Sequence, residues 1–233
     1  MNTVGYVHSF QSLGAVDGPG LRYVVFMQGC PYHCPYCHNP DTRDFTGGTP
    51  YSAAEIADKV ERYKTYFSKD GGVTVSGGEP LCQREFITEL FSVLHSRGIN
   101  TCIDTAGMRP DGAVRELLKH TDTVLCDIKM PTEEKYRELI GGSLNDTLDF
   151  IKLCNEMNVR VIIRHVVVPT ITDSEESLLA VKELLKGIQY EKIELLPFKK
   201  LCEHKYKELG LVFPLANIPE CSKETINKLK ALL

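Results

Sequence analysis

Three cysteines near the start of the sequence stand close enough together to bind one inorganic centre. Cys30, Cys34 and Cys37 follow a Cys-x3-Cys-x2-Cys spacing in a run with two prolines and a glycine, so a loop is expected there. A structural zinc site takes four ligands, usually as two separated pairs, and no second Cys/His pair at zinc-finger spacing follows. An iron–sulfur cube also takes four thiolates. Three local thiolates therefore predict a cube with one iron open to a non-protein ligand. The alternatives are a zinc knuckle completed by His33 or His38, or incidental cysteines.

Two further segments carry residues suited to binding a charged small molecule. Gly77, Gly78 and Glu79 follow a short apolar run. The glycines would let the backbone approach a ligand closely, although Gly-Gly followed by Glu-Pro is also an ordinary tight turn. Asp127 and Lys129 stand two residues apart, on the same side of an expected strand end. A solvent-facing salt bridge is the alternative interpretation of that pair.

Strand-like and helix-like patterns alternate along the whole chain. We predict strands over 21–27, 72–75, 101–104, 123–128, 160–168 and 192–196. We predict helices over about 52–68, 85–97, 111–119, 132–139, 145–157, 173–186 and 222–233. This alternation predicts an α/β fold with a parallel sheet, and six units fall short of the eight of a closed barrel. We find no linker or repeat, so a single domain over 1–233 is expected.

The polar motifs follow the predicted strands. Cys30, Ser76–Glu79, Asp104–Thr105, Asp127–Lys129 and Leu196–Lys199 all lie at or just beyond a predicted strand end. In parallel α/β barrels catalytic groups gather at the carboxyl ends of the strands. Arg164 lies near the end of a long apolar strand, and it must be paired if it is buried. A structural ion pair is the simplest interpretation of that arginine.

Composition excludes several classes of protein. The 233 residues are 42% hydrophobic and 25% charged with a net charge of −4, which argues against a nucleic-acid partner. No apolar run is as long as a membrane span, and residues 1–11 do not resemble a signal peptide. We therefore expect a cytoplasmic protein without a membrane partner.

Nine cysteines, an odd number, do not form a disulfide framework. Cys102, Cys126 and Cys154 fall in apolar patterns, where a thiol acts as a small buried hydrophobe. No role is assigned to the remaining three, which are Cys82, Cys202 and Cys221.

The cysteine spacing, with Tyr36 before the last cysteine, resembles the signature of the radical S-adenosylmethionine (SAM) superfamily. Further segments resemble the activating enzymes of glycyl-radical enzymes, and they span nearly the whole chain. These segments are His8–Phe10, Asp17–Arg22, Gln28–Cys30, Tyr36–Thr42, Ser76–Pro80, Asp104–Gly107, Asp127–Lys129, Arg164–Pro169 and Glu194–Pro197.

The resemblance implies a fold, cofactors and a set of site residues. The fold would be an open, partial (β/α)6 barrel. A [4Fe–4S] cluster would be bound by Cys30, Cys34 and Cys37. SAM would be contacted by Tyr36, Cys37, His38, Gly77, Gly78, Glu79, Asp127, Ile128 and Lys129. A monovalent cation would lie near Asp104, Thr105 and Asp127, and the substrate peptide would meet Asp17 and Arg164.

One position departs from the family pattern. Members typically have Leu-Leu-Pro-Tyr-His at the end of the last strand, and the histidine touches SAM. This chain has Phe198 and Lys199 in place of the Tyr-His pair. Lys199 could reach the same ligand, His204 could replace it, or the contact could be lost.

The resemblance also implies a reaction and a partner. A reduced cluster passes one electron to SAM, and the resulting 5′-deoxyadenosyl radical takes the Cα hydrogen of a glycine on a partner protein. The enzyme would therefore be an oxidoreductase, with a flavodoxin or ferredoxin as the electron donor. Relatives that act on other glycyl-radical enzymes often carry an inserted cluster domain, whereas residues 40–76 here contain no cysteine. Activators of the anaerobic ribonucleotide reductase are much shorter, so pyruvate formate-lyase is the expected partner.

Three alternatives remain at this point. One is an activator of another glycyl-radical enzyme, and another is a radical SAM enzyme that acts on a small molecule. The third is a non-catalytic iron–sulfur or zinc protein, such as an electron carrier.

Overall fold

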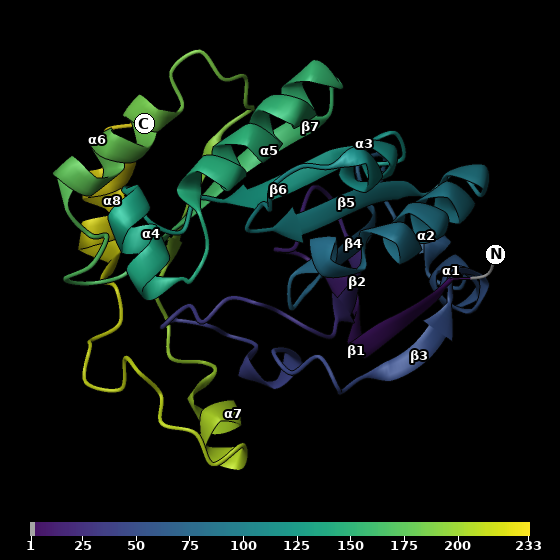
Figure 1. The fold of residues 1–233 in the computed structure, drawn as a ribbon, viewed down its shortest axis with the longest axis horizontal. Helices are drawn as coiled ribbons and strands as arrows, with labels where there is room; N and C mark the ends of the chain where they lie inside the picture. The colour runs from purple at the N-terminus through teal and green to yellow at the C-terminus, as the bar shows by residue number, and fades with distance from the viewer. Residues whose placement is uncertain (1–2) are drawn as a thin grey trace.

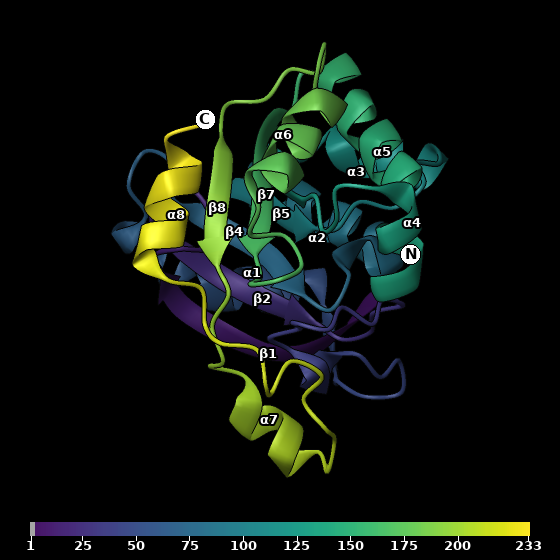
Figure 2. The ribbon, with the colours of Figure 1, turned by 90° about the vertical axis from the view of Figure 1, so that its left-hand side faces the viewer.

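The computed structural model describes residues 3–233, whose strands form one mixed sheet in the order β3-β1-β2-β4-β5-β6-β7-β8. The strands are β1 Val4–Gly14, β2 Arg22–Met27, β3 Thr49–Ser52, β4 Gly72–Gly77, β5 Asn100–Thr105, β6 Thr123–Asp127, β7 Arg160–Val167 and β8 Ile193–Pro197. From β2 through β8 the neighbouring strands are parallel. At the other edge β1 pairs antiparallel with both β2 and β3. The sheet is not closed, and the predicted fold class, an open partial barrel, is confirmed (Figures 1 and 2).

Most of the helices connect the parallel strands and cover the outside of the sheet, whereas the short helix at Glu203–Glu208 stands away from it (Figures 1 and 2). They are α1 Ala53–Glu61, α2 Arg84–Ser96, α3 Gly112–Leu118, α4 Glu133–Leu139, α5 Leu144–Glu156, α6 Glu175–Leu184, α7 Glu203–Glu208 and α8 Lys223–Lys230. Short 3-10 turns lie at η1 Pro40–Thr42, η2 Lys64–Tyr66 and η3 Pro80–Gln83. Within residues 3–233, no helix is both long enough and apolar enough to cross a membrane.

The six predicted strands and the seven predicted helices are all present. The predicted capping box is confirmed, since Ser52 accepts a hydrogen bond from the Glu55 amide while Glu55 accepts one from the Ser52 amide. The helix predicted over 52–68 was too long, because α1 ends at Glu61 just after its last buried residue, Val60. The strands β1 and β3 and the short helix α7 were not predicted.

A buried arginine, Arg22, fills the interior of the partial barrel at the amino ends of its strands. Arg22 is fully buried, and its Nε donates to Thr74 Oγ1 over 2.9 Å. Its Nη1 donates to Asn100 Oδ1 over 2.8 Å and to the Asp70 carbonyl over 2.9 Å. These bonds tie the starts of β2, β4 and β5 together and satisfy the buried charge. Above them the side chains of Cys102, Leu125 and Ile162 form a small apolar cluster.

Side chains two residues further along the same strands are polar. Asp104, Asp127 and Arg164 follow Cys102, Leu125 and Ile162 at a spacing of two, so they share the inward face. All three line a cavity at the carboxyl ends of the parallel strands. The fold thus buries an apolar layer at mid-barrel and presents charged groups above it.

Candidate active site

A cavity of about 280 Å³ opens at the carboxyl ends of the parallel strands. Its walls come from the loop that contains the three cysteines, the turn after β4, the ends of β5, β6 and β8, and the inward face of β7. Five of these segments follow or end a parallel strand, as the sequence predicted. Residues far apart in the sequence are thereby brought into one space.

The three cysteines lie together on one wall of this cavity. Cys30, Cys34 and Cys37 are free, partly exposed thiols on a loop without regular structure. Burial raises the pKa of Cys30 to about 12 and that of Cys34 to about 11, so both are protonated near neutral pH when no metal is bound. A bound metal centre would offset the effect of burial on these pKa values, because metals bind the thiolate form.

The chemistry of the three donors fits a cluster. A [4Fe–4S] cube is held by thiolates, each bound to a different iron, and Cys30, Cys34 and Cys37 are free thiols that all line the cavity. The donor set of three soft thiolates on one wall of a cavity therefore fits a cube.

The cysteine loop rests on two other loops that approach it very closely. A Cβ on Gly141, which has φ +78°, would lie 2.2 Å from His33 Cε1, and the His33 amide donates to the Ile140 carbonyl over 3.0 Å. On the other side, a Cβ on Gly78 would lie 2.2 Å from the Gly29 carbonyl oxygen. Only glycine fits at these contacts.

The glycines after β4 therefore have a packing role that the sequence did not reveal. Gly77 has φ +101°, and the Gly78 amide donates to the Met27 carbonyl over 2.9 Å. The Glu79 amide donates to the Gly29 carbonyl over 2.9 Å. The backbone that approaches these residues is that of the cysteine loop, although both glycines also line the cavity.

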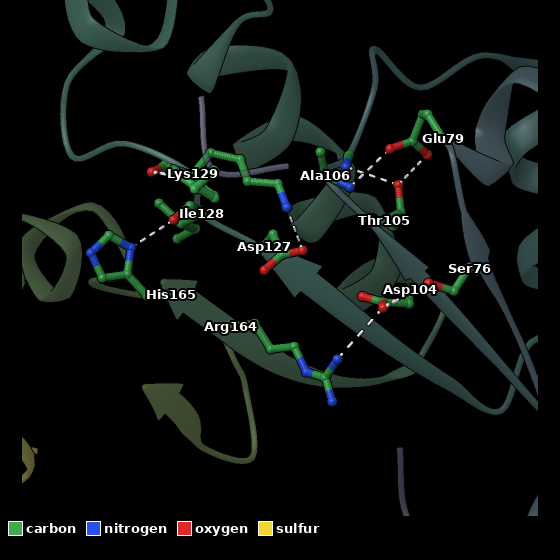
Figure 3. A network of polar contacts seen from close by, with 12 residues as sticks. Ser76, Glu79, Asp104, Thr105, Ala106, Asp127, Ile128, Lys129, Arg164 and His165 are labelled. Atoms are coloured by element: carbon green, nitrogen blue, oxygen red, sulfur yellow. Dashed lines mark hydrogen bonds and ion pairs between the residues drawn. The ribbon is translucent and has the colours of Figure 1, made fainter. Parts of the chain in front are cut away.

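Glu79 is buried and holds the end of β5 (Figure 3). Its carboxylate accepts hydrogen bonds from Thr105 Oγ1 over 2.5 Å, the Ala106 amide over 2.9 Å and the Leu81 amide over 3.0 Å. Burial raises the pKa of Glu79, while these donors lower it. Thr105 Oγ1 also accepts from the Gly107 amide over 2.9 Å. Three donors leave the carboxylate room for one further partner in the cavity.

Asp127 and Lys129 form an ion pair at the end of β6. Lys129 Nζ lies 2.7 Å from Asp127 Oδ2, and both side chains line the cavity (Figure 3). Burial alone would lower the pKa of Lys129, but Asp127 beside it raises that pKa well above its ordinary value. The lysine is therefore a fixed cation. Ile128 between them is buried and does not line the cavity.

Arg164 crosses the floor of the cavity and joins three segments. Its Nη1 lies 3.5 Å from Asp104 Oδ2, its Nε donates to Glu194 Oε2 over 3.2 Å, and its Nη2 donates to the Val16 carbonyl over 2.6 Å. Asp104 also accepts from Ser76 Oγ over 3.0 Å. The guanidinium thus offsets the negative charges of Asp104 and Glu194, and it holds the loop between β1 and β2 through the Val16 carbonyl.

Asp17, on that loop, does not line the cavity. Its Oδ2 is buried without a hydrogen-bond partner among the described residues. Burial raises the pKa of Asp17, and nearby Arg164 lowers it. This carboxylate is therefore held beside Arg164 with an acceptor oxygen unused.

The two candidates for the missing family histidine lie outside the cavity. Lys199 Nζ pairs with Glu220 Oε2 over 2.9 Å, and His204 is exposed on α7. The cavity wall here is formed by Phe198, which stands at the position of the family's tyrosine. His38 does line the cavity, with its Nε2 2.9 Å from the Lys199 carbonyl oxygen.

Sequence reasoning missed some wall residues. Tyr32 is buried, and its hydroxyl donates to the Gly107 carbonyl over 3.0 Å. Val166 and Phe198 supply apolar surface. Tyr32 could have been predicted from its position inside the cysteine loop. Val166 could have been predicted because it lies two residues after Arg164, on the same face of the strand.

Comparison with known proteins agrees with this geometry. Residues 24–181 match the family model of the Radical SAM superfamily. The chain is 45% identical over 232 residues to the pyruvate formate-lyase-activating enzyme of Clostridium pasteurianum, covering 99% of this chain and 97% of that protein. It is 40% identical over 237 residues to the pyruvate formate-lyase 1-activating enzyme of Escherichia coli K12, covering 100% of this chain and 96% of that protein.

A solved structure shares the fold at lower identity. A radical SAM methyltransferase from Sphaerobacter thermophilus superposes with a TM-score of 0.68 at 17% identity, over 91% of this chain and 63% of that one. The 40–45% identity to the activating enzymes, which extends over nearly their full length, is the stronger evidence for the family. This chain belongs to the radical SAM superfamily and, within it, to the family of the pyruvate formate-lyase-activating enzymes.

Proposed function

We propose that this protein activates pyruvate formate-lyase by forming a glycyl radical on it. The observation that carries the proposal is a single cavity that joins three free cysteine thiols to the polar ends of the neighbouring parallel strands. Identity of 40–45% to activating enzymes over the full chain supports the choice of partner. When bound, a [4Fe–4S] cluster and SAM supply one-electron cleavage of SAM and a 5′-deoxyadenosyl radical that removes a glycine Cα hydrogen.

Cys30, Cys34 and Cys37 would hold the cluster through their thiolates. Because all three cysteines line the cavity, they would hold the cluster beside the residues assigned to SAM. We assign His38, on the same wall, as a contact for SAM and not as a ligand of iron. Its ring already has a partner in the Lys199 carbonyl.

The groups of SAM match the charges of the cavity. Its ammonium would bind near Gly77, Gly78 and Glu79, where a buried carboxylate has room for one more donor. Its carboxylate would meet Lys129, whose ammonium is a fixed cation. Tyr36, Cys37 and His38 would bound the adenosyl part. Ile128 would act through its backbone, because its side chain does not line the cavity.

Lys199 would contribute least to SAM binding. Its ammonium is paired with Glu220 and stands outside the cavity. We propose that the polar contact of the family histidine to SAM is lost, because Lys199 at that position points away and the apolar side chain of Phe198, at the family's tyrosine position, forms the wall.

A monovalent cation could bind near Asp104, Thr105 and Asp127. Asp104 and Asp127 are close enough that the charge of Asp127 raises the pKa of Asp104, in addition to the larger effect of burial. A cation between two carboxylates relieves that repulsion. Such an ion would compete with Arg164 for Asp104 and with Lys129 for Asp127.

Arg164 lines the cavity and is suited to bind the backbone of an entering glycine loop, whereas Asp17, which does not line it, would meet that loop only after the segment between β1 and β2 moves. Arg164 already donates to a backbone carbonyl, that of Val16. Asp17 has a buried acceptor oxygen without a partner among the described residues. A peptide offers both a carbonyl and an amide to such a pair.

The remaining partners follow from the reaction and the composition. The electron would come from a low-potential donor such as a flavodoxin or ferredoxin. We propose a reducing, cytoplasmic setting for the free thiols. With a net charge of −4, neither nucleic acid nor a membrane surface is a proposed partner.

The proposal is tested by SAM cleavage under anaerobic, reducing conditions. Reconstituted protein should convert SAM to 5′-deoxyadenosine and methionine in equal amounts, measured by chromatography. Cys34→Ala protein should form neither. Reduced, iron-loaded protein that leaves SAM intact would favour a simple electron carrier instead.

A further inference from the structure

His165 lies on the outer face of β7, directly behind the floor of the cavity. Its neighbour Arg164 points inward, so by strand alternation His165 points the other way. The imidazole is 1% exposed, and its Nδ1 lies 2.7 Å from the Ile128 carbonyl oxygen (Figure 3). Its Nε2 is buried without a hydrogen-bond partner among the described residues.

These contacts fix the tautomer of His165. A carbonyl oxygen only accepts hydrogen bonds, so Nδ1 must carry the hydrogen. Nε2 then has a bare lone pair, which agrees with its lack of a donor. Burial lowers the pKa of His165, more than the Ile128 carbonyl and Asp127 raise it. The ring is therefore neutral.

The hydrogen bond falls where the backbone ladder between β6 and β7 ends. The Ile128 amide still donates to the Arg164 carbonyl over 2.9 Å. In a continued parallel ladder the Ile128 carbonyl would accept from a backbone amide of β7. His165 provides a side-chain donor at that point, which lets the chain leave the sheet without an unsatisfied buried carbonyl.

The next carbonyl along the chain is also held by a side chain. The Tyr36 hydroxyl donates to the Lys129 carbonyl over 3.1 Å. The two peptide planes on either side of Lys129 are thereby fixed. His165 on β7 holds the one before it, and Tyr36 of the cysteine loop holds the one after it. Because the planes on either side of Lys129 set the direction of its Cα–Cβ bond, they also direct its ammonium toward Asp127, 2.7 Å away.

We propose that His165 is a positioning residue for SAM binding, because its Nδ1–H holds the Ile128 carbonyl and so directs the side chain of Lys129 into the cavity. This inference rests on the proposed function, in which Lys129 meets the SAM carboxylate. His165 itself touches neither the cavity nor SAM.

Two amide substitutions separate hydrogen bonding from packing. In His165→Asn the amide nitrogen can take the place of Nδ1, whereas in His165→Gln it lies one bond further out, near the position of Nε2. His95→Gln is the matched control. His95 is also hydrogen-bonded, to Asp122 over 3.0 Å, but Asp122 precedes β6 at the opposite end of the barrel from the cavity.

The first measurement is SAM binding to anaerobically reconstituted protein with an oxidised cluster, in which no turnover occurs. We expect the dissociation constant to rise roughly tenfold in His165→Gln, and to stay within about threefold of wild type in His165→Asn. His95→Gln should bind as wild type does, and all variants should keep their iron. Equal affinity of the Asn and Gln variants, whether tight or weak, would overturn the proposal.

The second measurement needs neither cluster nor SAM. Nitrogen-15 NMR of histidine-labelled apoprotein should show one neutral Nδ1–H imidazole that disappears in His165→Asn. A neutral Nε2–H ring or a charged imidazolium at this position would contradict the hydrogen bond. If wild-type protein shows the Nδ1–H ring but does not bind SAM, the proposed function fails and the positioning role fails with it.

Discussion

The hydroxyl of Tyr36 donates a hydrogen bond to the backbone carbonyl of Lys129 over 3.1 Å, which joins the cysteine loop to the segment after β6. Tyr36 is buried, and it stands directly before the last cysteine of the motif. The residues proposed to hold the cluster and those proposed to hold SAM are thus one connected unit.

Tyr36→Phe should loosen that unit without dismantling it. The variant loses one hydrogen bond, worth about 1 kcal/mol, so we expect SAM binding to weaken about threefold to tenfold. The iron content should be unchanged. Equilibrium binding of SAM to the reconstituted variant measures the effect. Wild-type affinity would show that the hydrogen bond does not position Lys129.

Replacing each cysteine of the loop should abolish the cluster. Cys30→Ala, Cys34→Ala and Cys37→Ala should each prevent uptake of about four irons per chain on anaerobic reconstitution. Cys102 and Cys126 are fully buried in the sheet and serve as controls. Their alanine variants should keep the iron and lose only about 1 kcal/mol of unfolding free energy. A tightly bound zinc ion with no iron uptake would refute this assignment.

Gly78→Ala should damage the site through packing alone. The new Cβ would lie 2.2 Å from the Gly29 carbonyl oxygen, so the cysteine loop must shift. We expect a loss of about 1–3 kcal/mol in unfolding free energy and reduced iron uptake. Gly112→Ala is the control, because a Cβ there meets no atom within 4 Å, and it should be neutral or stabilising by less than about 1 kcal/mol. Thermal denaturation and iron analysis decide between these outcomes.

Arg164→Ala should impair radical formation on the partner more than it impairs SAM cleavage. Removing the guanidinium leaves Asp104 and Glu194 without their shared cation and frees the Val16 carbonyl. We expect a loss of about 3–5 kcal/mol in unfolding free energy, with cluster assembly and slow uncoupled SAM cleavage retained.

The control for Arg164 lies on the same strand. Arg160 forms a half-exposed ion pair with Glu191, so Arg160→Ala should cost less than about 1 kcal/mol and leave radical formation intact. If Arg164→Ala protein cannot assemble a cluster, the arginine is structural and its proposed role in peptide binding is wrong.

Much of this architecture could be predicted because it depends on local patterns. The six parallel strands are apolar runs bounded by turn residues, and the polar motifs follow them directly. The strand β1 is different, because Gly5, His8, Ser9 and Gln11 interrupt its pattern. It forms by pairing with β2 and β3, which are distant in sequence. Helix α7 has only six residues and no side-chain cap, so it gave no local signal.

The sequence predicted which residues lie at the site better than it predicted what those residues contact. Glu79 was expected to face a ligand, yet its hydrogen-bond donors include Thr105 and Ala106, more than twenty residues away. Lys199 was a candidate contact for SAM, and its partner is Glu220 on a later loop. His165 gave no signal at all, because a histidine in an apolar strand has no local mark of its hydrogen bond to Ile128.

The central claim is that this chain forms a glycyl radical on pyruvate formate-lyase. The most direct test mixes reduced, reconstituted protein with SAM and pyruvate formate-lyase without oxygen, and records the electron paramagnetic resonance spectrum. The account predicts the spectrum of a glycyl radical on the lyase, with its α-hydrogen splitting, that requires SAM and is absent with Cys34→Ala protein. SAM cleavage without any radical on the lyase, or a radical only on a different glycyl-radical enzyme offered in parallel, would contradict it.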